Sequence, residues 1–527
     1  MQLLSDTNLL TTLTFLPIVG AVILLFIKGE RVNEIKGFAL FTSIITFALS
    51  LLIFDYFDSS VADQQMVLRT PWIESFGINY AMGIDGISLF LVLLTTFLMP
   101  VVLAAGFGSV KKRVKEYMIC MLVLQAGMIG AFCALDLFLF YVFFEVMLIP
   151  MYLLIGVWGG EQRKYAAVKF FIYTLAGSLL MFAAILYARN VGGSFDIATL
   201  SERLPLIWGD EAMGTAATLC FFAFMLSFAI KTPLFPFHTW LPDAHTEAPT
   251  GGSVILAGVM LKLGTYGMMR FGLGFFPEQM VVYADVFVTL AVVGIIYGAL
   301  MAMAQEDFKK LVAYSSVSHL GFVVLGIFAF TSTASVGALL QMISHGLSTG
   351  LLFLLIGCLY DRRHTRMLDE FGGLAKVMPR YAVFLMIATL ASIGLPGLNG
   401  FIGEFMILAG SFGSADAVNA SGFEWTWMRT ATLLAGSGVI LGAVYMLTAY
   451  QKVFFGSLNR PENMALKDLT RWEGAYLLPM TVMCFVIGIY PSLMINPMEA
   501  SVEKLIAPAA EYRALELEAS AEVVAVK

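Results

Sequence analysis

Long apolar blocks separated by short polar segments make up most of the chain. A helix needs about 20 mostly apolar residues to cross the roughly 30 Å of bilayer hydrocarbon. Blocks of that length recur about fourteen times along the sequence. Apolar and polar residues do not alternate over ten-residue strands, as they would in an outer-membrane barrel. The pattern therefore predicts an all-α polytopic membrane protein with about fourteen transmembrane helices.

The expected spans begin near residues 8, 37, 86, 116, 137, 165, 214, 251, 282, 311, 333, 380, 431 and 474. The run from Tyr117 to Gly160 is too long for one crossing, so we divide it at Asp136 by a tight turn. Lys and Arg test this assignment, because cytoplasmic loops carry an excess of them. Alternate loops, beginning with the first, hold 21 of these residues and the other loops hold 5, which predicts that both termini lie outside.

Composition narrows the classes of function. Apolar residues make up 59% of the chain, charged residues only 13%, and the net charge is −6, so we expect no nucleic-acid partner. The cysteines stand singly in apolar segments without a CxxC motif, and we therefore expect no disulfide, metal site or iron–sulfur cluster in this chain. A GxxxxGK[ST] motif is also missing, which argues against nucleotide hydrolysis.

Four spans each carry one ionisable residue near the middle of the membrane. Each such charge costs roughly 2.5–3.5 kcal/mol on insertion scales, so something must offset the cost of all four. One or two of them could form a buried ion pair that only fixes helix register. The set of four favours a polar interior through which protons move. These residues are Glu145, Lys231, Lys262 and Glu404.

Two of these charges lie beside residues that break helices. Lys231 directly precedes a segment with two prolines, and Glu404 follows a segment rich in glycine. Broken helices at membrane depth are tolerated where the freed backbone groups face protein or water, and in transporters they lie on the ion path. The breaking residues are Pro233 and Pro236 in the seventh span and Pro396, Gly397 and Gly400 in the twelfth.

The spacing of the charged spans predicts an internal repeat. Glu145 and Lys231 are 86 residues apart, and His319 and Glu404 are 85 apart, so a shift of about 174 residues overlays the two sets. Such a repeat contains five spans, and an odd number inverts the second copy relative to the first. We therefore divide the chain into N-terminal helices (1–115), a first repeat (116–275), an inverted second repeat (280–456), and helix fourteen with a C-terminal tail (457–527).

Histidines are candidates for a proton relay, because an imidazole titrates near neutral pH. His238, His319 and His345 fall in or at spans seven, ten and eleven, although a lone histidine in an apolar span can equally be a structural residue. Asp243, His245 and Glu247 lie in the one alternate loop that lacks Lys and Arg. This loop is either a proton-access funnel or a polar cap for span eight, and we favour the cap.

Two segments resemble a known family. FFEVMLIPMY at 143–152 and KTPLFPFHTWLPDAHTEAPT at 231–250 are similar to the antiporter-like membrane subunits of respiratory complex I, the NADH:quinone oxidoreductase. The resemblance extends over nearly the whole chain and is strongest between about 130 and 410. Glu404 favours the M branch of that family, because the L and N branches and several sodium/proton antiporter subunits resemble one another in carrying lysine there.

The resemblance implies a proton-translocating subunit of a respiratory enzyme in the bacterial inner (plasma) membrane. Glu145 and Lys231 would form an ion pair at the first half-channel, Lys262 would be the central relay, and Glu404 the exit-side carrier. Movement of Glu145 away from Lys231 would release a proton towards the other sites. No cofactor is expected in this chain. NADH, FMN, iron–sulfur clusters and quinone would lie in partner subunits, and chains L and N and membrane lipid would be its neighbours.

Three other interpretations remain open from the sequence. A sodium/proton antiporter subunit of the Mrp type would share the fold and need no redox partner. The membrane arm of a proton-pumping hydrogenase or of a photosynthetic relative would differ in its electron donor. A membrane scaffold without transport would tolerate neutralisation of the four buried charges.

Overall fold

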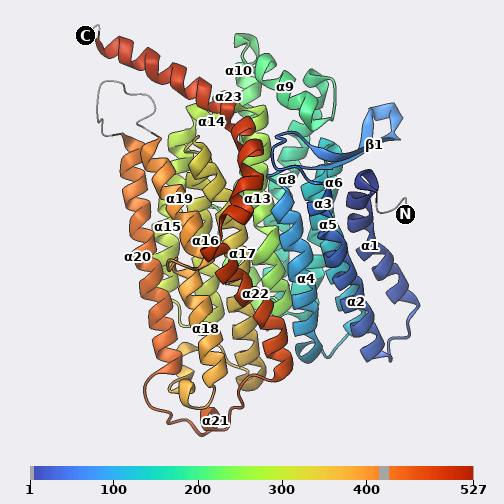
Figure 1. Cartoon of the computed structure of the whole chain (residues 1–527), viewed down its shortest axis with the longest axis vertical. Coiled ribbons are helices and arrows are strands. Elements are labelled where there is room, and N and C mark those ends of the chain that lie inside the picture. The colour runs from blue at the N-terminus through green and yellow to red at the C-terminus, as the bar shows by residue number, and fades with distance from the viewer. Residues whose placement is uncertain (1–4, 415–425, 526–527) are drawn as a thin grey trace.

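The computed structural model describes residues 5–414 and 426–525, which form a bundle of long, nearly parallel helices (Figure 1). Within these ranges, thirteen helical segments are long and apolar enough to cross a membrane. They are α1 (Asp6–Phe26), α2 with α3 (Val32–Ser50, Ile53–Tyr56), α4 (Leu89–Ser109), α5 (Val114–Cys133), α6 with α7 (Leu137–Val146, Leu148–Trp158), α8 (Arg163–Gly192), α10 (Gly214–Lys231), α12 to η5 (Thr250–Leu273), α15 (Ala284–Met303), α16 (Phe308–Ile327), α17 (Ser332–Arg363), α20 (Trp427–Phe454) and α22 (Arg471–Ile489).

Two shorter helices, α18 (Pro379–Ser392) and α19 (Asn399–Gly413), occupy the place of the expected twelfth span. The fold class is thus that of a polytopic helical membrane protein, while the count of fourteen crossings and the inverted repeat stay predictions. The tight turn expected at Asp136 is present, and its carboxylate caps α6 by accepting hydrogen bonds from the backbone N–H groups of Phe138 (3.0 Å) and Leu139 (3.1 Å).

The two ends of the bundle differ. A β-hairpin lies at the upper end in Figure 1, together with α9 (Ile197–Trp208) and α14 (Pro277–Val282), and we call it the hairpin end. The lower end carries the α1–α2 turn and α21 (Pro461–Met464). We call this lower end the basic end, because the α1–α2 turn and the loop around α21 are among the Lys- and Arg-rich segments.

A β-hairpin is the one sheet in the otherwise helical part of the chain that the structure describes. Strand β1 (Gln65–Ile73) pairs antiparallel with β2 (Ile78–Ile84) in the connection between α3 and α4. Trp72 and Ile73 are residue types that favour strands, and Gly77 supplies the left-handed backbone (φ 70°) that the turn requires. The pattern of apolar blocks did not resolve this short element, because it carries no membrane-length run.

The C-terminal tail is also more regular than expected. It forms α23 (Ser492–Ala525), a helix of 34 residues that crosses the face of the bundle in Figure 1. This helix packs against α14, α17 and η5. It therefore joins the last part of the chain to helices of both halves.

Two helical segments form the centre of the bundle. Within their most apolar stretches, α17 and the α12-to-η5 segment are buried along their whole length. The second of these comprises α12 (Thr250–Ile255), a π-helical stretch η4 (Leu256–Met260), α13 (Lys262–Gly267) and a second π-helical stretch η5 (Met268–Leu273). π-Helical turns inside α-helices are frequent at functional sites, and here they lie on both sides of Lys262.

The two predicted helix breaks are present. The chain leaves α10 at Lys231 and becomes helical again in α11 (Trp240–Glu247), because Pro233 and Pro236 cannot continue the hydrogen-bond ladder. The second break separates α18 from α19 over residues 393–398, where Gly394 (φ 73°) and Gly397 (φ 91°) adopt left-handed backbone.

Candidate functional site

Lys262 lies at the centre of the bundle, and its side chain is fully buried. Its ammonium Nζ donates a hydrogen bond to the carbonyl oxygen of Ala257, in the preceding π-helical stretch. The same Nζ lies 2.7 Å from Nδ1 of His345, which α17 contributes. The predicted relay residue therefore has a titratable neighbour on another helix.

A line of polar side chains continues from His345 to Glu404. The rings of His345 and His319 lie 5.7 Å apart between centroids. Nδ1 of His319 lies 2.8 Å from Oε1 of Glu404, and Gln341 Nε2 donates to the same oxygen at 2.9 Å. Two of the four lone charges and two of the three candidate relay histidines thus meet in one place. The structure brings Lys262, His345, His319 and Glu404 into one buried row, which we call the central row.

The second helix break holds Glu404 in this row. Asn399, at the start of α19, donates from Nδ2 to the carbonyl oxygen of Ser344 (2.9 Å), and Ser344 Oγ donates back to the Asn399 carbonyl oxygen (3.0 Å). A Cβ on Gly400 would lie 2.1 Å from the carbonyl oxygen of Ala391, so only glycine allows this close approach. These contacts fix α19 against α17, the helix that carries His345.

A small cavity of about 10 Å³ adjoins Glu404. It is bordered by His319, Ser392 and Tyr445 as well as by the carboxylate, and Ser392 Oγ lies 3.5 Å from His319 Nε2. A space of this size has room for about one water molecule, and His319, Ser392 and Glu404 offer it polar partners. The central row therefore ends, at Glu404, beside a cavity that one water molecule can fill.

The first half of the molecule is arranged differently. Lys231 Nζ is buried 4.8 Å from the ring centroid of Phe144, and it has no hydrogen-bond partner among the described residues. Glu145 is half-buried and makes no ion-pair contact with Lys231 among the described residues, although the two charges still act on each other. The ion pair that the resemblance implies therefore stays a prediction: the two side chains lie apart here, with the ring of Phe144 beside the ammonium.

Lys231 also stands apart from the central row. The helices that carry Lys231 and Lys262 pack closely, since a Cβ on Gly264 would lie 2.3 Å from Oγ1 of Thr232. Thr232 Oγ1 is buried without a hydrogen-bond partner in the described ranges. No direct hydrogen bond thus links the Lys231 ammonium to Lys262 in the part of the chain that the structure describes, and the hydroxyl of Thr232 lies at the junction of the two helices.

His238 is not a member of the row. It follows the first break and packs its ring against Tyr297 (5.2 Å between centroids) and Tyr314 (6.4 Å). Its Nδ1 is buried without a partner among the residues described. Its role in proton transfer stays a prediction.

The loop with Asp243, His245 and Glu247 contacts the start of span eight through the His245 carbonyl oxygen, which accepts a hydrogen bond from Ser253 Oγ (3.1 Å), and its role as cap or proton entry stays a prediction. Asp243 Oδ2 pairs with Lys169 Nζ of α8 at 2.7 Å, and Glu247 Oε2 accepts a hydrogen bond from the Gln162 backbone N–H at 2.9 Å, just before α8. Both carboxylates therefore fix span six. His245 is fully buried, stacks on Phe353 (4.7 Å between centroids) and leaves both ring nitrogens unpartnered within the described chain.

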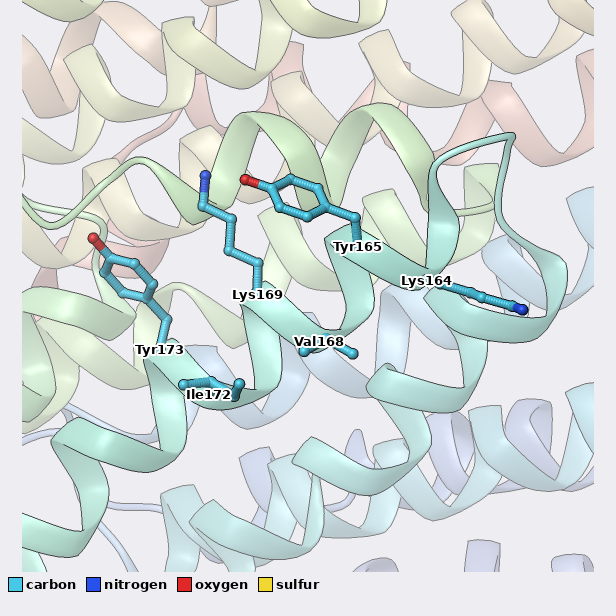
Figure 2. Close-up of a pocket in the computed structure, with 6 residues that line it drawn as sticks. All are labelled: Lys164, Tyr165, Val168, Lys169, Ile172 and Tyr173. Atoms are coloured by element: carbon cyan, nitrogen blue, oxygen red, sulfur yellow. The ribbon is translucent and has the colours of Figure 1, made fainter.

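Lys169 also borders an open apolar groove on the outer face of α8 (Figure 2). Figure 2 shows the Lys169 ammonium beside the hydroxyl of Tyr165, while Lys164 points away from both. Tyr165 and Ile172 are 58% and 60% exposed, so this face is apolar surface that no described part of the chain covers. The groove is lined by Lys164, Tyr165, Val168, Lys169, Ile172 and Tyr173.

Sequence reasoning missed several polar residues of the site. Gln341 precedes His345 by four residues on α17, and this spacing places both side chains on one face, which is a signal that could have been used. Lys309 was counted as a loop charge, but it is only 6% exposed and its ammonium donates to the Ala248 carbonyl oxygen. Its place at the start of an apolar helix gave no warning of this burial.

Comparison with known proteins agrees with this architecture. Residues 134–423 match a family profile described as NADH:quinone oxidoreductase/Mrp antiporter, TM. The chain belongs to this NADH:quinone oxidoreductase/Mrp antiporter family. Residues 12–131 match a second profile, NADH-ubiquinone oxidoreductase chain 4, amino terminus. All four residues of the central row lie inside the first match.

Relatives in the family cover nearly the whole chain. NADH-quinone oxidoreductase subunit M of Rhodobacter capsulatus is 46% identical, over 95% of this chain and 96% of the relative. NADH-ubiquinone oxidoreductase chain 4 of Marchantia polymorpha is 43% identical, over 94% and 97%. Relatives of the subunit M and chain 4 type therefore match both halves of the chain.

Solved structures of the family share the fold. A chain of respiratory complex I from Thermus thermophilus, with bound NADH, superposes with a TM-score of 0.82 at 32% identity, over 94% of this chain and 99% of that one. A chain of the Mrp complex from a Dietzia species gives a TM-score of 0.81 at 20% identity, over 98% and 99%. At that identity the second likeness concerns the fold alone.

Proposed function

We propose that this chain is the proton-translocating M-type subunit of an NADH:quinone oxidoreductase, in which protons move along the central row. The observation that carries the proposal is the buried line from the Lys262 ammonium through His345 and His319 to the Glu404 carboxylate. Each member can take up or release a proton, and buried ionisable groups inside a membrane bundle are typical of proton relays. The subunit M relatives support the same assignment.

Proton transfer along the row needs only short steps. Lys262 Nζ faces His345 Nδ1, so a proton can pass from the ammonium to this nitrogen when Nδ1 carries no proton of its own. His319 Nδ1 faces Glu404 Oε1 in the same way. Rotation of a ring or one bridging water would span the 5.7 Å between the two histidine rings. Gln341 holds the receiving carboxylate in place by its hydrogen bond.

Lys231 and Glu145 form, on this proposal, the gate that feeds the row. An opposite charge nearby stabilises an ammonium ion, and its withdrawal into an apolar site favours release of the proton. The separated arrangement, with Lys231 against Phe144, corresponds to the release step. Moving one proton against 100 mV costs about 2.3 kcal/mol. Making or breaking one hydrogen bond to a buried charged group changes the free energy by a similar amount, about 1.5–3 kcal/mol.

The groove on α8 is the place where we expect a neighbouring subunit. Glu145 lies on α6, which packs against α8, and the exposed face of α8 is apolar. A partner that covers this face would reach Glu145 and could draw it away from Lys231. Chains of the L and N type are the neighbours we propose, with membrane lipid around the rest of the bundle.

Electron transfer is assigned by this proposal to other subunits of the complex. NADH, FMN, iron–sulfur clusters and quinone would bind there, and their reactions would drive the gate. We place the chain in a bacterial inner membrane with the basic end in the cytoplasm and both termini outside. The excess of Lys and Arg in alternate loops supports that orientation.

A Lys231→Ala variant of the whole complex tests the proposal. We expect it to abolish NADH-driven proton pumping in vesicles while NADH oxidation by an artificial acceptor continues, because the gate is lost and the redox subunits are intact. Lys452→Ala, at an exposed lysine of α20, is the matched control and should pump normally. Normal pumping by Lys231→Ala would remove Lys231 from the path.

A sodium/proton antiporter of the Mrp type is the second candidate, since the matching family profile includes both classes. It predicts that loss of the chain makes growth sensitive to sodium and leaves respiration unchanged. The subunit M proposal predicts the reverse: NADH-dependent respiration is lost, and sodium has no specific effect.

A further inference from the structure

A second charged pair lies deep in the bundle outside the central row. Arg270, in the π-helical stretch η5, contacts Asp85 through two parallel hydrogen bonds, Nη1 to Oδ2 at 2.6 Å and Nη2 to Oδ1 at 2.7 Å. Asp85 is 2% exposed and Arg270 is 8% exposed. A two-bond pair of this kind is the geometry in which arginine binds a carboxylate most strongly.

The pair lies on the same side of the helix as Lys262. Lys262, Tyr266 and Arg270 follow one another at intervals of four residues, which places them in one row along the segment. Eight residues of helix separate the two cations by roughly 12 Å. Arg270 Nε donates to Tyr266 Oη (3.3 Å), and Tyr266 Oη donates to the Phe132 carbonyl oxygen (3.4 Å). Arg270 therefore stands between Lys262 and the hairpin end.

Segments from the hairpin and from the C-terminal helix close this region. Gln64 Nε2 donates to Asp85 Oδ2 at 2.7 Å. The Gly86 backbone N–H donates to Ser501 Oγ of α23 (3.0 Å), and that hydroxyl donates to the Ala62 carbonyl oxygen (3.1 Å). The helix α23, which the sequence did not predict, thus covers the pair from the hairpin side.

Neither partner exchanges protons readily near neutral pH. An arginine side chain stays protonated in proteins. Burial alone would raise the pKa of the Asp85 carboxyl, but the Arg270 guanidinium and the N–H groups of Ser88 and Ile87 outweigh burial and hold that pKa below its ordinary value. The pair also occupies the hydrogen bonds of Tyr266 and Gln64, so these side chains are not free to pass a proton on.

We propose that the Arg270–Asp85 pair is a barrier that keeps protons on Lys262 from leaking directly to the hairpin end of the bundle. The pair acts through its position and by holding its polar neighbours in hydrogen bonds, and it directs protons sideways to His345 and Glu404. This inference rests on the proposed function, because a barrier matters only where Lys262 carries protons. A barrier role also explains why Arg270 and Asp85 are buried at all, since burying two charges costs free energy and the central row does not use them.

The test measures passive proton influx into vesicles that contain the whole purified complex, with a potassium diffusion potential imposed and no NADH present. The double variant Asp85→Leu with Arg270→Met removes both charges at similar volume. We expect a several-fold faster influx than in the unmodified complex. Adding Lys262→Ala to the double variant should return the influx to the unmodified rate, because the leak passes through that ammonium.

The matched control is another two-bond pair, Arg362 with Glu473, at 2.6 and 2.7 Å. It joins the basic ends of α17 and α22, so Arg362→Met with Glu473→Leu should leave proton influx unchanged. An unchanged influx in the Asp85–Arg270 double variant would overturn the barrier. A raised influx that persists after Lys262→Ala would also overturn it, because the pair would then be only a structural seal.

Single variants keep the proposal testable if the double variant does not assemble. Arg270→Gln leaves the Asp85 carboxylate buried without its cation, where it can take up a proton, and should leak, whereas Arg362→Gln at the control pair should stay proton-tight. Equal influx in the two contradicts the barrier. NADH-driven pumping separates this failure from that of the proposed function. Normal pumping by Lys262→Ala alone would overturn the function, whereas lost pumping by Lys262→Ala together with a tight Arg270→Gln overturns only the barrier.

Discussion

Each of the two broken helices carries one buried ionisable side chain beside its break, but the surroundings of the two side chains differ. Beside the first break, Lys231 is buried without a hydrogen-bond partner among the described residues, and Glu145 does not reach it. Beside the second break, Glu404 accepts a hydrogen bond from Gln341 and shares another with the ring of His319. Burying a charge without a hydrogen-bond partner costs free energy, so its protonation state changes readily. Hydrogen bonds to a buried charge offset that cost and stabilise its protonation state. On the proposed function, this difference would place the switching step in the first half and the holding step in the second.

The largest expected effect concerns the switching half. Lys231→Arg keeps the positive charge but replaces the ammonium by a group that does not release its proton near neutral pH. We expect nearly complete loss of NADH-driven pumping, measured with a pH-sensitive dye in vesicles, at an unchanged rate of NADH oxidation by an artificial acceptor. If Lys231→Arg pumps like the unmodified complex, charge alone is sufficient at this position and the switch is refuted.

A smaller loss is expected in the holding half. Glu404→Gln preserves the shape of the side chain and its contact with His319, but it cannot take up a proton. Pumping should fall strongly while the complex keeps its thermal stability, because the hydrogen bonds that fix α19 through Asn399 and Ser344 are untouched. A loss of stability as large as the loss of pumping would make Glu404 a structural residue.

The smallest effect concerns the backbone of the second break. Gly397 has φ 91°, and a methyl group added there would meet no atom within 4 Å, so Gly397→Ala changes only backbone strain. We expect destabilisation of about 1–2 kcal/mol, seen as a lower midpoint of thermal unfolding. Gly436→Ala in α20, also without a neighbour within 4 Å, is the control and should be neutral or slightly stabilising. Equal midpoints for the two variants would show that the break tolerates ordinary residues.

Much of this comparison could be predicted from the sequence. Prolines 233 and 236 cannot donate to a helix, and the glycines before Glu404 favour a turn, so both breaks follow from residue chemistry. The four lone charges were found because lipid-depth segments otherwise contain few ionisable residues. Lys262 and Glu404 lie in the predicted relay because their helices, like those of His345 and His319, face the centre of the bundle.

Other features depend on packing that the sequence pattern does not encode. The contact of the Lys231 ammonium with the ring of Phe144 joins two different helices, so it depends on packing and not on spacing along the chain. The hairpin and α23 lack membrane-length apolar runs, so a search for spans passed over them. Arg270 is one of the five Lys and Arg residues that the sequence places in the other loops. Its burial could not be predicted, because its partner Asp85 lies 185 residues away in the chain.

The most direct measurement is the number of protons translocated per NADH oxidised by the Lys262→Ala complex, with Lys452→Ala measured alongside it. Lys262 is the point at which the row from Glu404 and His345 reaches the first half. We predict a clear fall in this ratio for Lys262→Ala and none for Lys452→Ala. An unchanged ratio in Lys262→Ala would contradict proton movement along the row.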